Sequence, residues 1–206
     1  MTDVETITSI LCGPPGDDVW HWDTVSATSI QFKPDGTGRL VLAQELNLWI
    51  ACPFTYTHTP SSPQTTTTTK PTTPLTTTLN LTLHPTKLPT LDAAESLAIP
   101  PGRLYNADLL HPSTFAPHTR TIAVSLEKGR FQTQFEQRHR DSGVGWPEFE
   151  WKVRFEPSVF PGREAWREAR GAPDAMRFWT WDEFYRGRVG VKGDGNGGWR
   201  GWCGVM

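Results

Sequence analysis

Apolar and polar residues alternate along most of this chain, and this alternation limits its possible folds more than any other feature. The clearest case is 148–156, where Phe149, Trp151, Val153 and Phe155 alternate with charged side chains. Successive side chains of a strand point to opposite faces, so the pattern predicts a strand with one buried and one solvated face. Such half-solvated strands are typical of antiparallel sheets, because parallel strands are covered on both faces.

Other segments repeat the pattern. Further strands are predicted at 20–23, 28–33, 40–56, 79–83, 121–127 and 177–182. Asp35-Gly36 predicts a hairpin turn, and Lys128-Gly129 predicts another turn after 121–127. The run 40–56 is too long for one strand, so we expect a break at Ala43-Gln44-Glu45.

Helix signals are few and short. Asp92-Ala-Ala-Glu95 is a capping-box-like start, and Gly162–Ala169 after Pro161 predicts a two-turn helix. Strands and helices do not alternate, which argues against a parallel sheet. We therefore expect one mostly-β domain, a single antiparallel meander of about eight strands that closes into a barrel, because closure removes the unpaired edges.

Three segments are predicted to lie outside the barrel, which would span 17–186. Residues 1–16 end in Gly-Pro-Pro-Gly, a breaker sequence, and are expected to be flexible. Residues 59–78 hold eleven Thr and are expected to form a disordered loop, either a modification platform or a tolerated insertion. Residues 187–206 hold eight Gly and are expected to be a flexible tail.

A tryptophan strand, Val19-Trp-His-Trp-Asp23, is followed by a Phe-x-x-Asp-Gly-Thr-Gly hairpin at 32–38. This opening resembles the start of calycin barrels, the lipocalin and fatty-acid-binding-protein group. The resemblance implies that Trp20 or Trp22 closes one barrel end, and that Arg177 or Arg186 packs over it as a cation–π contact. The opening, together with 171–181, is also similar to uncharacterised proteins of filamentous fungi, which implies a source but no activity.

The chain holds 10 Trp, and this number motivates the hypothesis that some of them bind a ligand. The predicted binding residues are Trp20, Trp22, Trp151, Trp179, Trp181 and Arg177. Aromatic rings on the first and last strands would wall an interior pocket, or would fill a barrel that has no cavity. The leading hypothesis is a non-enzymatic module that binds a small apolar or aromatic molecule.

Two alternatives stay open. In an enzyme, His21 and Asp23 would share a strand face as an acid–base pair, or Glu45 would place a polar group in the cavity. Each of these candidates also has a purely structural explanation. His21 would be an exterior histidine that is hydrogen-bonded to Asp23, and Glu45 would lie in a bulge or turn. In a protein-interaction module, Trp199 and Trp202 of the tail would dock on a partner.

Other function classes are disfavoured. The 20 basic and 22 acidic side chains leave no basic excess for nucleic acid, and no apolar run is long enough to span a membrane. The histidines show no metal-ligand spacing, and no cofactor motif occurs, so neither metal nor cofactor is predicted. The start of the chain lacks a basic leader, and the 3 cysteines lie far apart. We therefore expect free thiols and a cytoplasmic or nuclear location.

Overall fold

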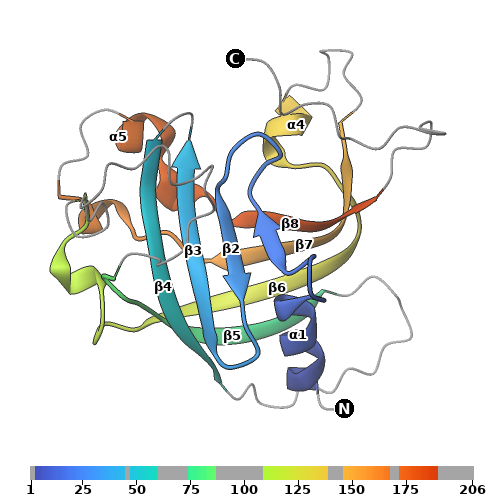
Figure 1. Cartoon of the computed structure of the whole chain (residues 1–206), viewed down its shortest axis with the longest axis horizontal. Coiled ribbons are helices and arrows are strands. Elements are labelled where there is room, and N and C mark those ends of the chain that lie inside the picture. Colours follow the sequence, from blue (N-terminus) through green and yellow to red (C-terminus); the bar gives the residue numbers. More distant parts are fainter. Residues whose placement is uncertain are drawn as a thin grey trace.

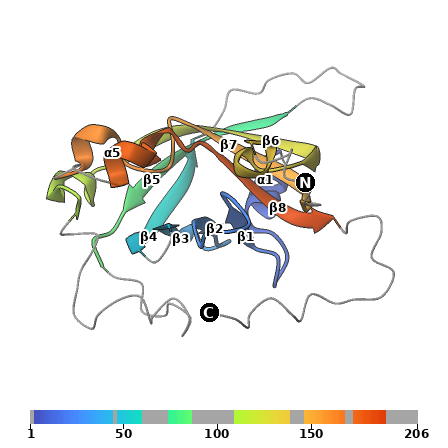
Figure 2. The same ribbon diagram turned by 90° about the horizontal axis from the view of Figure 1, so that it is seen from above.

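A computed structural model of the chain describes residues 3–44, 47–59, 74–86, 109–138, 146–167 and 172–189. Within these residues, eight strands form a closed antiparallel barrel in the order of the sequence, and the last strand pairs with the first (Figures 1 and 2). The strands are β1 (Val19–His21), β2 (Ser29–Phe32), β3 (Thr37–Gln44), β4 (Asn47–Thr59), β5 (Leu75–Leu83), β6 (Arg120–Phe131), β7 (Glu148–Glu156) and β8 (Glu183–Val189). The predicted meander is confirmed.

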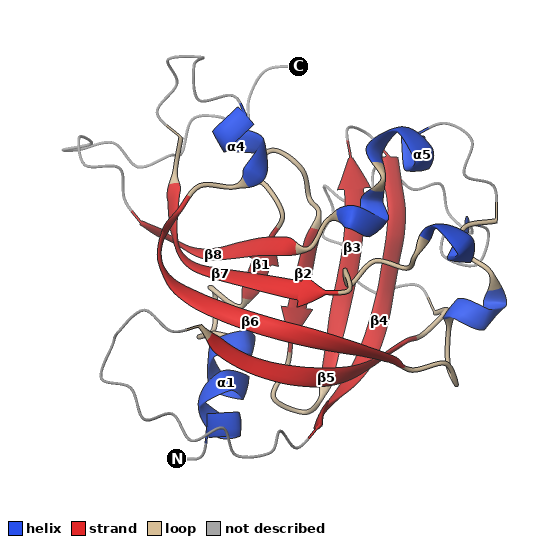
Figure 3. Ribbon diagram, turned by 180° about the vertical axis from the view of Figure 1, so that it is seen from behind, coloured by secondary structure: helices blue, strands red, loops and turns tan. Residues whose placement is uncertain are grey.

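The helices of the described part are short and lie between the strands or before them. They are α1 (Asp3–Cys12), α4 (Gln134–Arg138) and α5 (Ala172–Met176), with the 3-10 helices η1 (Pro112–Thr114), η3 (Arg163–Ala165) and η4 (Phe178–Thr180). Helix α1 and helix α5 lie toward opposite ends of the barrel (Figures 1 and 3). The barrel therefore has an α1 end and a far end.

Several strand boundaries confirm the sequence predictions. Strand β7 covers the predicted 148–156, and the long run breaks where expected, between Gln44 and Asn47. The Asp35-Gly36 hairpin is also confirmed: Lys33 N donates to Thr37 O at 2.8 Å, and Gly36 has a φ of 80°. Glycine adopts this left-handed conformation without the steric cost of a side chain.

Two predictions about β structure are wrong. Lys128-Gly129 is not a turn, because β6 continues to Phe131 through a register shift, and a bulge absorbs the extra residues. Residues 177–182 are not the final strand. Arg177 has a left-handed backbone with a φ of 52°, helix η4 follows it, and β8 begins only at Glu183.

The helices differ from the sequence predictions. Within the described part of Gly162–Ala169, residues 162–167, only the three-residue helix η3 forms. The helix expected from Asp92 lies outside the described residues. At the start of the chain, where a flexible segment was expected, helix α1 forms and buries Ile7 and Leu11 against the barrel. It ends at Gly13, which has a φ of 67° and whose N donates to Ser9 O at 3.0 Å, a left-handed helix cap.

The Thr-rich segment is partly strand. Residues Leu75–Thr78 belong to β5 and pair with β6, since β-branched threonine suits an extended backbone. Likewise Gly187–Val189 belong to β8. The rest of the predicted loop, 60–73, and of the predicted tail, 190–206, lie outside the described residues, as do Trp199 and Trp202.

The barrel interior is apolar. Inward side chains from consecutive strands form one buried cluster, for example Ile30, Leu40, Cys52, Leu81 and Phe155. Along β5 and β6 these side chains alternate with exposed or half-buried ones, as the sequence pattern predicted. In β3, β4 and β8 the intervening residues Val41, Ala51 and Tyr185 are buried as well.

Cys52 gives a simple test of this interior. Burial raises the pKa of its thiol to about 12, so almost no reactive thiolate exists at pH 8. We expect iodoacetamide at that pH to leave Cys52 unmodified in the native protein and to modify it fully in urea, as measured by peptide mass spectrometry. Equal modification in both states would contradict the buried position.

Gly38 gives a second test. A Cβ on Gly38 would lie 2.4 Å from Gln31 O and 2.2 Å from the Phe54 ring, so the backbones of β2 and β3 would have to separate. We expect Gly38→Ala to lower the free energy of unfolding by about 1–3 kcal/mol. The control is Gly129→Ala, an exposed strand position where the Phe131 ring can move aside. Equal stability of the two variants would show that Gly38 is not tightly packed.

Candidate functional site

The α1 end of the barrel is closed by one contact set. Trp20 of β1 is fully buried, and its Nε1 donates to Leu11 O at the end of α1 at 2.8 Å. The Arg186 guanidinium of β8 lies 4.3 Å from the centre of the Trp20 ring, and its Nη1 donates to the same carbonyl at 3.2 Å. The tryptophan, the arginine and the helix end therefore hold one another in place.

The sequence left two tryptophans and two arginines as candidates for the cation–π contact, and the structure decides between them. Trp20 and Arg186 make the expected cation–π contact. Arg177 does not: it is exposed and precedes η4, outside the sheet. Its left-handed backbone marks a turn between α5 and η4, so it does not line the barrel interior. The expected ligand-binding position of Arg177 is therefore not supported by its placement.

The far end of the barrel holds a second aromatic group, which we call the far-end aromatic cluster. Its members are Trp22, Trp49, Phe160, Trp166, Phe178 and Trp181. Trp22 and Trp181 stack with ring centres 3.5 Å apart and planes within 8° of parallel. The Phe178 ring meets Trp181 edge-on at 4.9 Å, and Trp166 packs against Phe178 at 6.0 Å. Such aromatic pairs stabilise the fold by more than the burial of their apolar surface alone.

Most of the cluster stands outside the strands. Trp22 follows β1, Phe160 and Trp166 follow β7, and Phe178 and Trp181 lie in or beside η4. The sequence prediction found Trp22 and Trp181 by their spacing. Phe160 and Trp166 were missed because loop segments carry no alternation. Phe178 was missed because 177–182 was predicted as a strand, in which Phe178 and Trp181 lie on opposite faces.

The remaining predicted tryptophans lie elsewhere. Trp179 is half-buried beneath the Arg163 guanidinium, whose central carbon is 5.8 Å from the ring centre. Trp151 is also half-buried, with the Lys128 ammonium 5.2 Å from its ring centre. Both pack against the core from its surface, so neither belongs to the stacked pair.

The predicted acid–base residues are not assembled into a catalytic pair. Asp23 is buried and accepts hydrogen bonds from Val25 N, Ser26 N and Ser26 Oγ, which fixes the turn after β1. His21 is exposed at the end of β1, and the structure contains no hydrogen bond between these two described side chains. Glu45 lies outside the described residues.

That turn is anchored to the rest of the barrel. Thr24 Oγ1 donates to the buried Glu136 carboxylate at 2.7 Å. Glu136 also accepts from Thr133 N at 2.8 Å, while Glu136 N donates to Thr133 Oγ1, a capping box at the start of α4. The loop that carries Trp22 is therefore tied down on its outer side.

Other site classes find no support in the described part of the chain. No group of three His, Cys, Asp or Glu side chains there is placed to hold a metal ion. Among the helices of the described segments, none has the length and apolar character needed to cross a membrane. Cys12 and Cys52 are free and buried.

Comparisons with known proteins give no assignment. No family model, no curated protein and no solved structure matches this chain.

Proposed function

We propose that this protein is a non-enzymatic β-barrel module that binds a small apolar or aromatic molecule, which enters at the far end of the barrel. The observation that carries the proposal is the difference between the two ends. The α1 end is held by hydrogen bonds among Leu11, Trp20 and Arg186. The far end is held by aromatic packing between segments outside the sheet, and the hydrogen bonds there, from Ser158 Oγ to Trp181 O and from Phe155 N to Asp182 O, involve the backbone and not the stacked rings.

The chemistry of the interior supports this ligand class. The inward positions of the described strands are almost all aliphatic or aromatic. Such a surface gains free energy by covering apolar area, whereas a polar ligand would lose its hydration without replacement hydrogen bonds. The Trp22 and Trp181 rings stack on each other, so a planar ligand would stack on one of them when the other moves aside.

The far end is also the part of the barrel that opens at least cost. Helix η4 has three residues and α5 has five, and the two meet at the left-handed Arg177. Segments with few backbone hydrogen bonds open locally with less free energy than core strands. Displacing Trp181 would leave the hydrogen bonds between paired strands in place.

Three further points belong to the same proposal. A relation to calycin barrels is supported by the Trp20–Arg186 contact and the eight-stranded meander. A relation to the filamentous-fungal proteins rests on the sequence resemblance alone. A cytoplasmic or nuclear location is supported by the two buried free thiols.

Native mass spectrometry of gently purified protein tests the proposal. We expect a bound apolar molecule that is released by organic extraction, and we expect Trp181→Leu to retain less of it than the wild type. The control is Trp151→Leu, which lies outside the far-end aromatic cluster. A ligand-free wild type that also binds no apolar molecule added back would overturn the proposal.

A further inference from the structure

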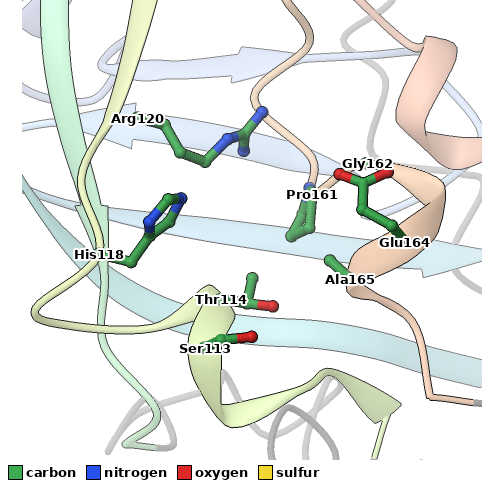
Figure 4. A pocket seen from close by; sticks show the side chains of 8 residues that line it. All are labelled: Ser113, Thr114, His118, Arg120, Pro161, Gly162, Glu164 and Ala165. Carbon is green, nitrogen blue, oxygen red and sulfur yellow. The ribbon is translucent and has the colours of Figure 1, made fainter.

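A polar pocket lies outside the apolar interior, between the segment before β6 and the segment after β7 (Figure 4). Its volume is about 310 Å³, which suits a small molecule. It is lined by Ser113, Thr114, His118, Arg120, Pro161, Gly162, Glu164 and Ala165. The two segments are held together by the backbone hydrogen bond from His111 N to Ala165 O at 2.8 Å, so the walls of the pocket are fixed relative to each other.

Thr114 supplies a polar group that lacks a partner. Its side chain is 6% exposed, and its Oγ1 makes no hydrogen bond within the described part of the protein. A buried hydroxyl without a partner is unfavourable by an amount comparable to a lost hydrogen bond. A ligand atom in the pocket would satisfy it.

Arg120 supplies a fixed cation. Its guanidinium donates to Val159 O at 2.8 Å, Ser158 O at 2.6 Å and Phe160 O at 3.2 Å. These three bonds orient the group and use three of its five N–H donors, which leaves two for a ligand. The acceptors are neutral carbonyls, so they leave the positive charge uncompensated.

Glu164 supplies an anion across the pocket from Arg120 (Figure 4). Its carboxylate folds back over Gly162, where a Cβ would lie 2.3 Å from Glu164 Oε1. The glycine therefore permits this placement. No ion pair within 4.0 Å joins Glu164 to Arg120 in the described structure, so the pocket holds two separated charges of opposite sign.

We propose that this pocket binds a small zwitterion that carries an ammonium and a carboxylate group, of the size of a small amino acid. The carboxylate accepts from the free N–H groups of Arg120, the ammonium donates to Glu164, and Thr114 Oγ1 completes the hydrogen bonds. A simple anion would be repelled by Glu164 and a simple cation by Arg120. This site is independent of the apolar ligand of the barrel interior.

Three probes of similar shape separate these charge types: L-alanine, L-lactate and L-alaninamide. Each is titrated into ¹⁵N-labelled full-length protein and followed by amide chemical shifts. We expect L-alanine to shift the amides of 113–120 and 162–165, and to bind about tenfold or more tightly than the other two, since each loses one charged hydrogen bond. Equal binding of lactate and alanine, or no shifts with any probe, would overturn the proposal.

Two variants assign the effect to the pocket. Glu164→Gln keeps the shape and removes the anion, so alanine should bind about tenfold more weakly and no better than lactate. Thr114→Val removes the unpartnered hydroxyl, and should weaken alanine binding without loss of thermal stability. The control is Glu156→Gln, an exposed carboxylate on β7 that does not line the pocket. Unchanged alanine binding in Glu164→Gln would also overturn the proposal.

Discussion

Trp20→Ala is expected to lower the free energy of unfolding by about 3–5 kcal/mol, the cost of removing a fully buried tryptophan. The indole fills the α1 end of the barrel and donates to Leu11 O. Its loss leaves the Arg186 guanidinium without its aromatic partner in a buried position. Equilibrium urea denaturation, followed by far-ultraviolet circular dichroism, measures the change.

The matched control is Trp179→Ala. This tryptophan also has an arginine over its ring, but it is half-buried at the surface. We expect a loss of about 1 kcal/mol or less. If the two variants lost the same stability, the Trp20–Arg186 contact would not be what closes the barrel.

Leu11→Ala is expected to lower the free energy of unfolding by about 2–5 kcal/mol. Leu11 is fully buried although it lies in the terminal helix, and it contacts the barrel core. Removing its side chain leaves a cavity between α1 and the strands. The same denaturation experiment measures the change.

Ser9→Ala is the control in the same helix. Ser9 is exposed, so its replacement should change stability by less than about 0.5 kcal/mol. A Leu11→Ala protein as stable as Ser9→Ala would mean that α1 does not pack against the barrel in solution, and the α1 end would then be open.

The barrel could be predicted because alternation reports directly on a strand with one buried face. Strand β7 has this pattern without interruption, and its boundaries were predicted to the residue. Helix α1 was missed for the opposite reason. Gly13-Pro-Pro-Gly16 predicts the end of a flexible segment, whereas Ile7 and Leu11, four residues apart, share the face that a helix buries.

The final strand was misplaced because Trp179 and Trp181 alternate as strand residues do. The backbone at Arg177 is left-handed, which alternation cannot reveal, and η4 follows. The observed position of the last strand also decides which of the two candidate arginines contacts the tryptophan. Arg186 lies on the true last strand beside β1, so it reaches Trp20, while Arg177 remains exposed.

The candidate sites were only partly predictable. Trp22 and Trp181 were expected to be neighbours, because the first and last strands of a barrel are paired. Trp166 and Phe178 complete the far-end aromatic cluster from loops whose approach depends on tertiary contacts. The polar pocket was not predicted at all, since Thr114, Arg120 and Glu164 form no sequence motif.

Ligand binding at the far end of the barrel is tested by a titration with N-phenyl-1-naphthylamine, a neutral apolar probe whose fluorescence rises in an apolar site. We expect saturable binding of one probe per barrel. Trp181→Leu should weaken this binding about tenfold, since a stacking partner is lost, and Trp151→Leu should leave it unchanged. Thermal unfolding confirms that both variants are folded. A probe signal that never saturates, or equal affinity in two folded variants, would contradict ligand binding at the far end of the barrel.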